Sequence, residues 1–151
     1  MLEVMDKLWW MQVSYGFIAI LGFSIRSNIK GWKLLFTSIG GALSWGLYLL
    51  FLAWSSSLLL SVFLATLAVC LYSEFMGRAF KVPVAVFVIC SIIPLVPGSG
   101  LYYSMIAYID GRTLEAMRKM GETMMIAGTI SVAIAVMSSV ANIFRKMLRM
   151  F

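Results

Sequence analysis

The sequence predicts an all-α membrane protein with about five transmembrane helices, the fourth of them broken, and one short amphipathic helix. Apolar residues make up 62% of the 151 residues and charged residues only 12%. A soluble domain usually has about 45–50% apolar and about 25% charged residues. The mean hydropathy is +0.98. The charges gather between long uncharged stretches, so residues 1–151 are expected to form a single membrane domain.

The first three predicted spans cover residues 8–24, 34–54 and 58–73. The first begins with Trp9 and Trp10, whose side chains suit the interface between membrane and water. Residues 34–73 carry no charge and are about twice as long as one span. They should therefore form two helices, joined at the serine cluster that follows Trp54.

The fourth predicted span, residues 82–108, is interrupted by two prolines and two glycines, at Pro94, Pro97, Gly98 and Gly100. In hydrocarbon, broken helix is tolerated only where it faces protein or a water-filled cavity. Many transporters build their substrate sites from discontinuous spans of this kind. The half-helix that starts near Ser99 would aim its first backbone N–H groups at the break, where they suit a carboxylate.

Hydroxyl groups lie on both sides of this predicted break, at Ser91, Ser99, Tyr102 and Tyr103. Together with the prolines and glycines they are the predicted residues of a substrate path. The alternative is a proline kink in a packed helix that carries no substrate.

Residues 112–123 predict a short amphipathic helix at the membrane surface, and residues 125–144 a fifth span. The apolar positions recur at helical spacing, at Leu114, Met117, Met120 and Met124. The other face carries charges that form favourable four-apart pairs, Glu115 with Lys119 and Arg118 with Glu122.

Basic residues predict the orientation in the membrane. With five spans, one side receives eight of the 12 lysines and arginines, namely Arg26, Lys30, Lys33, Arg78, Lys81, Arg145, Lys146 and Arg149. The other side receives Lys7, Arg112, Arg118 and Lys119. The positive-inside rule then places the C-terminus in the cytoplasm and the N-terminus outside. A re-entrant fourth segment would move residues 112–123 inside but the basic tail outside, so we expect five spans.

Four charged residues are candidates for coupling or gating, namely Glu74, Arg78, Asp110 and Arg26. Glu74 and Arg78 are four apart and would pair on a continuing helix, although an exposed pair contributes less than about 1 kcal/mol. No acid lies deep in a span, where proton-coupled transporters usually carry one. Three alternatives remain: Glu74 or Asp110 is the coupling acid, a partner subunit supplies that acid, or the coupling does not depend on such an acid.

Several classes of function are disfavoured by composition. The chain has no histidine, the commonest metal ligand and general base, so we expect no metal, no cofactor and no enzyme. Cys70 and Cys90 lie in apolar runs and suit buried positions. The net charge is +6, and the basic residues lie at the ends of apolar segments, which favours anionic lipid over nucleic acid as a partner. The N-terminus shows no pattern of a cleavable signal peptide.

Small residues predict close helix contacts, because they let backbones approach in a membrane. Two groups stand out: Ala127, Ser131, Ala135 and Ser139 in the fifth span, and Thr37, Gly40, Gly41 and Ser44 in the second. Both fit packing within the chain or an interface between subunits. Five helices make a thin bundle, so we expect a second copy or another subunit.

Three stretches resemble the threonine/serine exporter family, and specifically its C-terminal half. They are residues 22–45 with the Gly40-Gly41-Ala42-Leu43-Ser44-Trp45 run, residues 74–83 from Glu74 to Pro83, and residues 93–111 with Pro94-Leu95-Val96-Pro97-Gly98. The last stretch is the most specific of the three.

The resemblance implies a stand-alone small subunit that works with a larger subunit carrying the N-terminal half of the family. It implies export of small metabolites across the bacterial inner membrane, either threonine and serine or small dicarboxylates, driven by the ion gradient. It does not identify the substrate or a set of binding residues. The alternative is a structural or assembly subunit without a transport path of its own.

Overall fold

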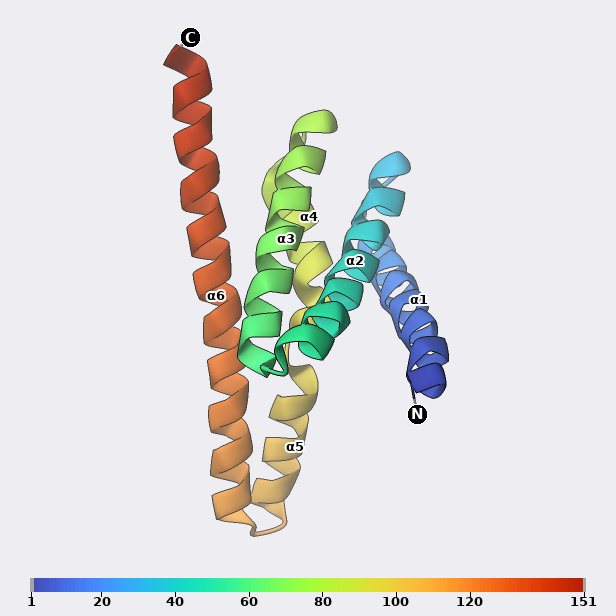
Figure 1. Ribbon diagram of the computed structural model, residues 1–151, viewed down its shortest axis with the longest axis vertical. Helices are drawn as coiled ribbons and strands as arrows, with labels where there is room; N and C mark the ends of the chain where they lie inside the picture. The colour runs from blue at the N-terminus through green and yellow to red at the C-terminus, as the bar shows by residue number, and fades with distance from the viewer. Residues whose placement is uncertain (1, 151) are drawn as a thin grey trace.

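The computed structural model describes residues 2–150, and the side chains of residues 8–143. All regular elements in this part are helical (Figure 1). They are α1 (Leu2–Arg26), α2 (Trp32–Ser55), α3 (Leu58–Ala79), α4 (Val84–Ile92), a 3₁₀ turn η1 (Ile93–Leu95), α5 (Gly98–Ile109) and α6 (Thr113–Met150). The predicted all-α class is confirmed.

The helices give four or five membrane crossings. Residues 8–26 of α1, helices α2 and α3, and residues 113–143 of α6 are each long and apolar enough to span a membrane. Helices α4 and α5 form one further span if taken together, and they are bent by 48° at the break between them. A bend of this size does not reverse the chain, and α5 continues away from α4 in Figure 1. The prediction of about five spans with a broken fourth is confirmed.

The ends of α2 and α3 follow local signals in the sequence. Ser56 is left-handed (φ 53°) and donates its N–H to the Leu52 carbonyl at 3.1 Å, which ends α2 at the predicted serine cluster. Helix α3 continues to Ala79, six residues beyond the predicted end of the third span, so Glu74 and Arg78 lie on this helix. The loop is residues 80–83, and α4 begins directly after Pro83, its N-cap residue.

The expected separate amphipathic helix is not present. Residues 113–123 and the fifth predicted span belong to one continuous helix, α6, of 38 residues. No proline interrupts them, and ion pairs join successive turns, Glu115 with Lys119 at 2.8 Å and Arg118 with Glu122 at 3.1 Å. At 1.5 Å per residue α6 is about 57 Å long, almost twice the thickness of the hydrocarbon layer.

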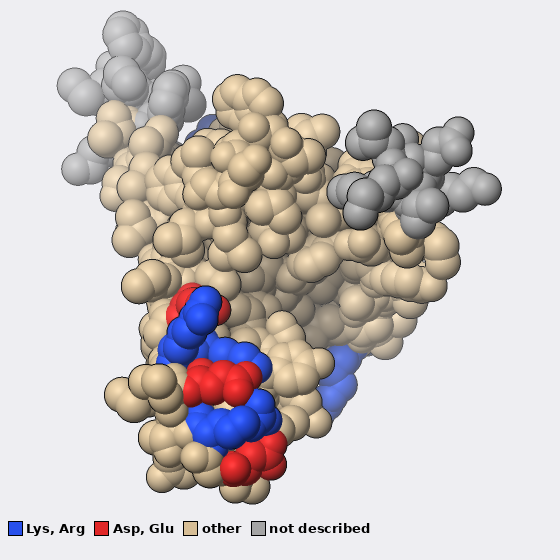
Figure 2. Space-filling view, turned by 60° about the horizontal axis from the view of Figure 1, so that its bottom comes forward, with Lys and Arg blue, Asp and Glu red and all other residues tan. Residues whose placement is uncertain are grey.

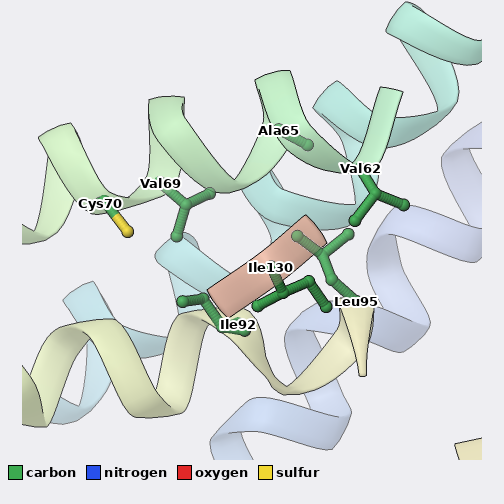
Figure 3. Packing of buried hydrophobic residues seen from close by; sticks show 7 residues of the cluster. All are labelled: Val62, Ala65, Val69, Cys70, Ile92, Leu95 and Ile130. Atoms are coloured by element: carbon green, nitrogen blue, oxygen red, sulfur yellow. The ribbon is translucent and has the colours of Figure 1, made fainter. Parts of the chain in front are cut away.

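The core lies where α3 meets α4, η1 and α6. Figure 3 shows Val62, Ala65, Val69 and Cys70 of α3 facing Ile92 and Leu95 of the broken span, with Ile130 of α6 completing the cluster. Small and branched side chains allow these backbones to approach closely. In a membrane such packing supplies most of the association energy, because lipid tails are as apolar as the side chains.

The small residues of α2 pack within the chain. Thr37, Gly40, Gly41 and Ser44 are all buried. A Cβ on Gly40 would collide with the Ser91 hydroxyl of α4, and a Cβ on Gly41 would collide with Ile20 of α1. Helix α2 therefore touches α1 on one side and α4 on the other at positions that only glycine fits.

The small residues of α6, in contrast, face away from the rest of the chain. Ala127, Ser131, Ala135 and Ser139 are exposed, while Ile130, Ala133 and Ala141 form the buried side of the helix. Packing within this chain therefore does not explain this stripe.

Helix α5 and the first turns of α6 form a hairpin that extends beyond the turn between α2 and α3 (Figure 1). Helix α5 packs mainly against α6. Near the end of the hairpin, acidic and basic side chains alternate in one patch (Figure 2). Its ion pairs join Arg112 to Asp110 at 2.7 Å and to Glu115 at 2.6 Å, in addition to the two pairs within α6.

Candidate functional site

The break in the fourth span is a short ordered turn. After the 3₁₀ turn, Val96 is extended, and its N–H donates to the Ile93 carbonyl at 3.1 Å. Pro97 has φ −78° and ψ 58°, and Gly98 donates its N–H to the Val96 carbonyl at 2.8 Å. These angles and this bond define an inverse γ-turn. Pro94 has no N–H, so it cannot satisfy the carbonyl one turn earlier, that of Cys90.

The N-terminus of α5 is open. No side chain caps this helix, and its first intrahelical bond runs from the Leu101 N–H to the Pro97 carbonyl at 3.4 Å. Gly98 and Ser99 are exposed, and nothing lies within 4 Å of the position that a Cβ on Gly98 would take. The first N–H groups of a helix have no acceptor within it and carry a partial positive charge. This end of α5 is therefore suited to an anionic group.

The break has a packed side and an open side. Leu95 is buried in the core, whereas Ile93 and Pro94 line a cavity of about 350 Å³ together with α1 and α2. In this cavity the Trp45 indole N–H donates to the Gln12 amide oxygen at 3.2 Å. Neither residue was predicted to belong to the site from the sequence. Gln12 is the single glutamine of the chain and lies in an apolar span, which was the available signal.

The predicted path residues do not all converge. Ser91 is fully buried against Gly40, and its hydroxyl has no hydrogen-bond partner within the described residues. Tyr102 and Tyr103 are exposed on α5, and their rings lie edge to face with centroids 5.4 Å apart. The Lys119 ammonium lies 5.5 Å from the centroid of the Tyr103 ring. The structure places Pro94, Pro97, Gly98 and Ser99 together at the break.

Gly100 has a different environment from Gly98, although both lie in the first turn of α5. A Cβ on Gly100 would collide with the Thr123 hydroxyl of α6, whose own bond goes to the Lys119 carbonyl at 2.7 Å. Gly100 therefore allows α5 to approach α6, while Gly98 faces open space.

Glu74 and Arg78 form the predicted ion pair on α3, with Arg78 Nη2 at 2.9 Å and Nε at 3.2 Å from Glu74 Oε1. The Glu74 side chain is only 11% exposed and that of Arg78 45%. Val62, which packs near the break, and Glu74 are twelve residues apart on α3, a rise of about 18 Å. The ion pair and the break are therefore two separate places.

The two other candidate coupling residues lie apart from the break and from the Glu74–Arg78 ion pair. Asp110 follows α5 in the hairpin loop, is exposed, and binds Arg112. Arg26 is the last residue of α1 and is also exposed. Among the residues that the structure describes, no three His, Cys, Asp or Glu side chains gather closely enough to hold a metal ion.

Residues 12–140 match the model of a protein family described as "Threonine/Serine exporter, ThrE". The matched stretch contains the break, the cavity beside it and the ion pair. No curated protein and no solved structure matches the chain.

Proposed function

Since this chain belongs to the threonine/serine exporter family, we propose that it is one subunit of a complex that exports small polar metabolites across the bacterial inner membrane. The family match carries this proposal. The open N-terminus of α5 supports it, because a broken span with an uncapped helix end is a common way to bind an anionic group inside a transporter.

The proposed path runs along the open side of the break. Backbone N–H groups at Ser99 and Gly100 bind the carboxylate of the solute, which threonine, serine and dicarboxylates share. Pro94 and Pro97 hold the break in place, because neither residue can continue the helix. The tyrosines of α5 line the path beyond this point, whereas Ser91 lies before it and is buried against Gly40, away from the open side.

The proposed partner is a larger membrane subunit that carries the other half of the family. The exposed stripe from Ala127 to Ser139 on α6 supports a contact outside the chain, because it does not serve packing within it. Five helices alone make a thin wall for a polar path, so the partner or a second copy would complete it.

The proposed orientation places the loop after α1, the loop after α3 and the C-terminus in the cytoplasm. The described basic residues on that side include Arg26, Lys30, Lys33, Arg78 and Lys81. The α5–α6 hairpin then lies on the outer side, where its charge patch is internally paired. The proposed driving force is the ion gradient, with Glu74 and Arg78 as coupling or gating groups.

The test replaces Gly98 with leucine, because a side chain here enters open space at the break and meets no neighbour. Efflux of labelled threonine is measured from cells that express the chain together with its larger partner. We expect Gly98→Leu to abolish efflux while the protein still reaches the membrane in normal amount, and Gly98→Ala to retain most of it.

The control places leucine at an exposed apolar position of the same helix, Met105, where no path is proposed. Met105→Leu should export like the original chain. Efflux that is unchanged in Gly98→Leu would remove the break from the mechanism and favour a structural or assembly subunit.

A further inference from the structure

A groove of about 700 Å³ runs between α5 and the first turns of α6, on the hairpin that extends beyond the turn between α2 and α3 (Figure 1). Its larger side chains are exposed and apolar or aromatic, namely Leu101, Met105 and Tyr108 of α5 and Met117, Met120 and Met124 of α6. Among the described residues, no charged side chain lines the groove. An exposed apolar surface of this size is typical of a binding surface.

Lipid does not cover the whole groove, because α6 is longer than the hydrocarbon layer is thick. The Glu74–Arg78 pair lies one turn before the loop after α3, which places it near one surface of the membrane, and Ala141 of α6 lines a cavity with both residues. The hydrocarbon layer is about 30 Å thick, or about 20 residues of helix. Counted back along α6 from Ala141, the layer ends near Gly121. The charged residues from Asp110 to Glu122 mark the same boundary. The part of the groove nearer the hairpin loop therefore faces water.

We propose that this groove binds the same groove of a second copy of the chain, so that two hairpins form a four-helix bundle. Two antiparallel helices with one apolar face exposed are half of such a bundle. A two-fold axis along the membrane normal brings the two grooves face to face, while both copies keep the same orientation in the membrane. One surface then forms both sides of the interface.

The hairpin is complementary to its own copy in shape and in charge. Methionine side chains are unbranched and flexible, so those of the two grooves can interdigitate. The segment from Asp110 to Glu122 carries three acidic and three basic residues, which alternate in the patch of Figure 2. Its net charge is zero, so two copies do not meet the repulsion that like-charged surfaces would produce.

The exposed face of α6 continues the groove into the membrane. Two series of exposed or partly exposed residues recur there at intervals of seven: Met117, Met124, Ser131 and Ser138, and Gly121, Gly128 and Ala135. A Cβ on Gly121 or Gly128 would have no neighbour within 4 Å. A strict seven-residue repeat keeps two helices in contact along a left-handed supercoil, and small residues let their backbones approach in a membrane. The α6 helix of a second copy has the same length and the same repeat, so it matches this face along its whole course.

This interface goes beyond the proposed function and does not depend on it. Ser131 and Ala135 belong to the exposed stripe of α6, so a second copy takes that face. The exposed side of α1, with Trp10, Tyr15 and Ile18, remains for the larger subunit.

The test is disulfide cross-linking in membranes of cells that express the full chain without the larger subunit. Single cysteines replace Met124 and Ser131 on the proposed interface. The matched controls are Met125→Cys and Val132→Cys, one residue further along α6, where an exposed side chain points about 100° away. The chain's own two cysteines are buried, so the original chain is the blank. A disulfide needs Cβ atoms about 4 Å apart, so we expect cross-linked dimer at the two interface positions and about a tenth as much or less at the controls.

A second measurement is native mass spectrometry of the purified chain. Met117→Glu places an unpaired charge in the groove and should lower the dimer fraction at least about tenfold. Leu114→Glu makes the same change outside the groove lining and should leave the dimer fraction unchanged. Both side chains are exposed in the single chain, so neither change disturbs its packing.

Equal cross-linking at Met124→Cys and Met125→Cys, or no dimer at either interface position, would overturn the proposal. Cross-links that run only to the larger subunit when both are expressed would assign the groove to that subunit and also overturn it. The outcome is separate from that of the proposed function, because neither measurement involves transport. A chain that dimerises through this groove, in a complex that exports nothing, would support the interface and contradict the exporter.

Discussion

Replacing Gly100 with alanine should destabilise the α5–α6 hairpin, because the added Cβ meets Thr123. The new methyl group would overlap the Thr123 hydroxyl and lie 3.3 Å from its Cβ and 3.5 Å from its Cγ2. Thr123 is buried and bound to the Lys119 carbonyl, and β-branched side chains have few rotamers in a helix. Rotation of Thr123 therefore does not clear the space.

The size of the effect follows from two opposing terms. Overpacking of this kind costs about 1–3 kcal/mol. Alanine recovers up to about 1 kcal/mol relative to glycine in a helix. We expect Gly100→Ala to lower the free energy of unfolding by up to about 2 kcal/mol. Gly98→Ala, two residues earlier and without a neighbour within 4 Å, should be neutral or stabilise slightly.

The assay is a denaturant titration in mixed micelles, followed by circular dichroism, on the original chain and four variants: Gly98→Ala, Gly100→Ala, Thr123→Ala and the double variant Gly100→Ala/Thr123→Ala. Thr123→Ala removes the obstructing groups, so the cost of Gly100→Ala should largely disappear in that background. Equal stability of Gly98→Ala and Gly100→Ala, or strict additivity with Thr123→Ala, would refute the reasoning.

Three further predictions test the path and the orientation. Ser91→Ala removes a buried hydroxyl without a described partner, so the stability should stay the same or rise and threonine efflux should not change; a lower free energy of unfolding would contradict this interpretation. Ser99→Cys should react with a small water-soluble thiol reagent, and added threonine should slow that reaction; a cysteine that stays unreactive would show a dry break. An impermeant maleimide applied to intact cells should label Leu114→Cys in the hairpin and leave Ser27→Cys after α1 unlabelled. The reverse pattern would invert the proposed orientation.

The sequence predicted the elements that local chemistry determines. Pro94 and Pro97 located the break, because a residue without an N–H cannot continue the helical hydrogen bonds. The serines after Trp54 located the turn between α2 and α3. The four-apart spacing of Glu74 and Arg78 predicted their ion pair, although the helix that holds them was expected to end earlier.

The sequence did not predict contacts between residues that are far apart in the chain and meet only when the helices pack. Gln12 and Trp45 are far apart in the chain, and only the packing of α1 against α2 brings their side chains to Pro94. The same holds for Glu74 and Asn142, which α3 and α6 bring to one cavity. Periodicity alone also did not reveal that the charged segment and the last span form one helix, because both halves are helical in either arrangement.

The length of α6 has a mechanical consequence. One end of this helix packs against α5 through Thr123 and Gly100, and the other end places Asn142 beside Glu74 on α3. Long helices bend only gently unless a proline or a bulge kinks them, and no proline lies in α6. A tilt imposed on the hairpin by a neighbouring subunit would therefore also move Asn142 at the other end of α6. It would change the width of the cavity that Asn142 and Glu74 line, without any change in the turn at Pro97.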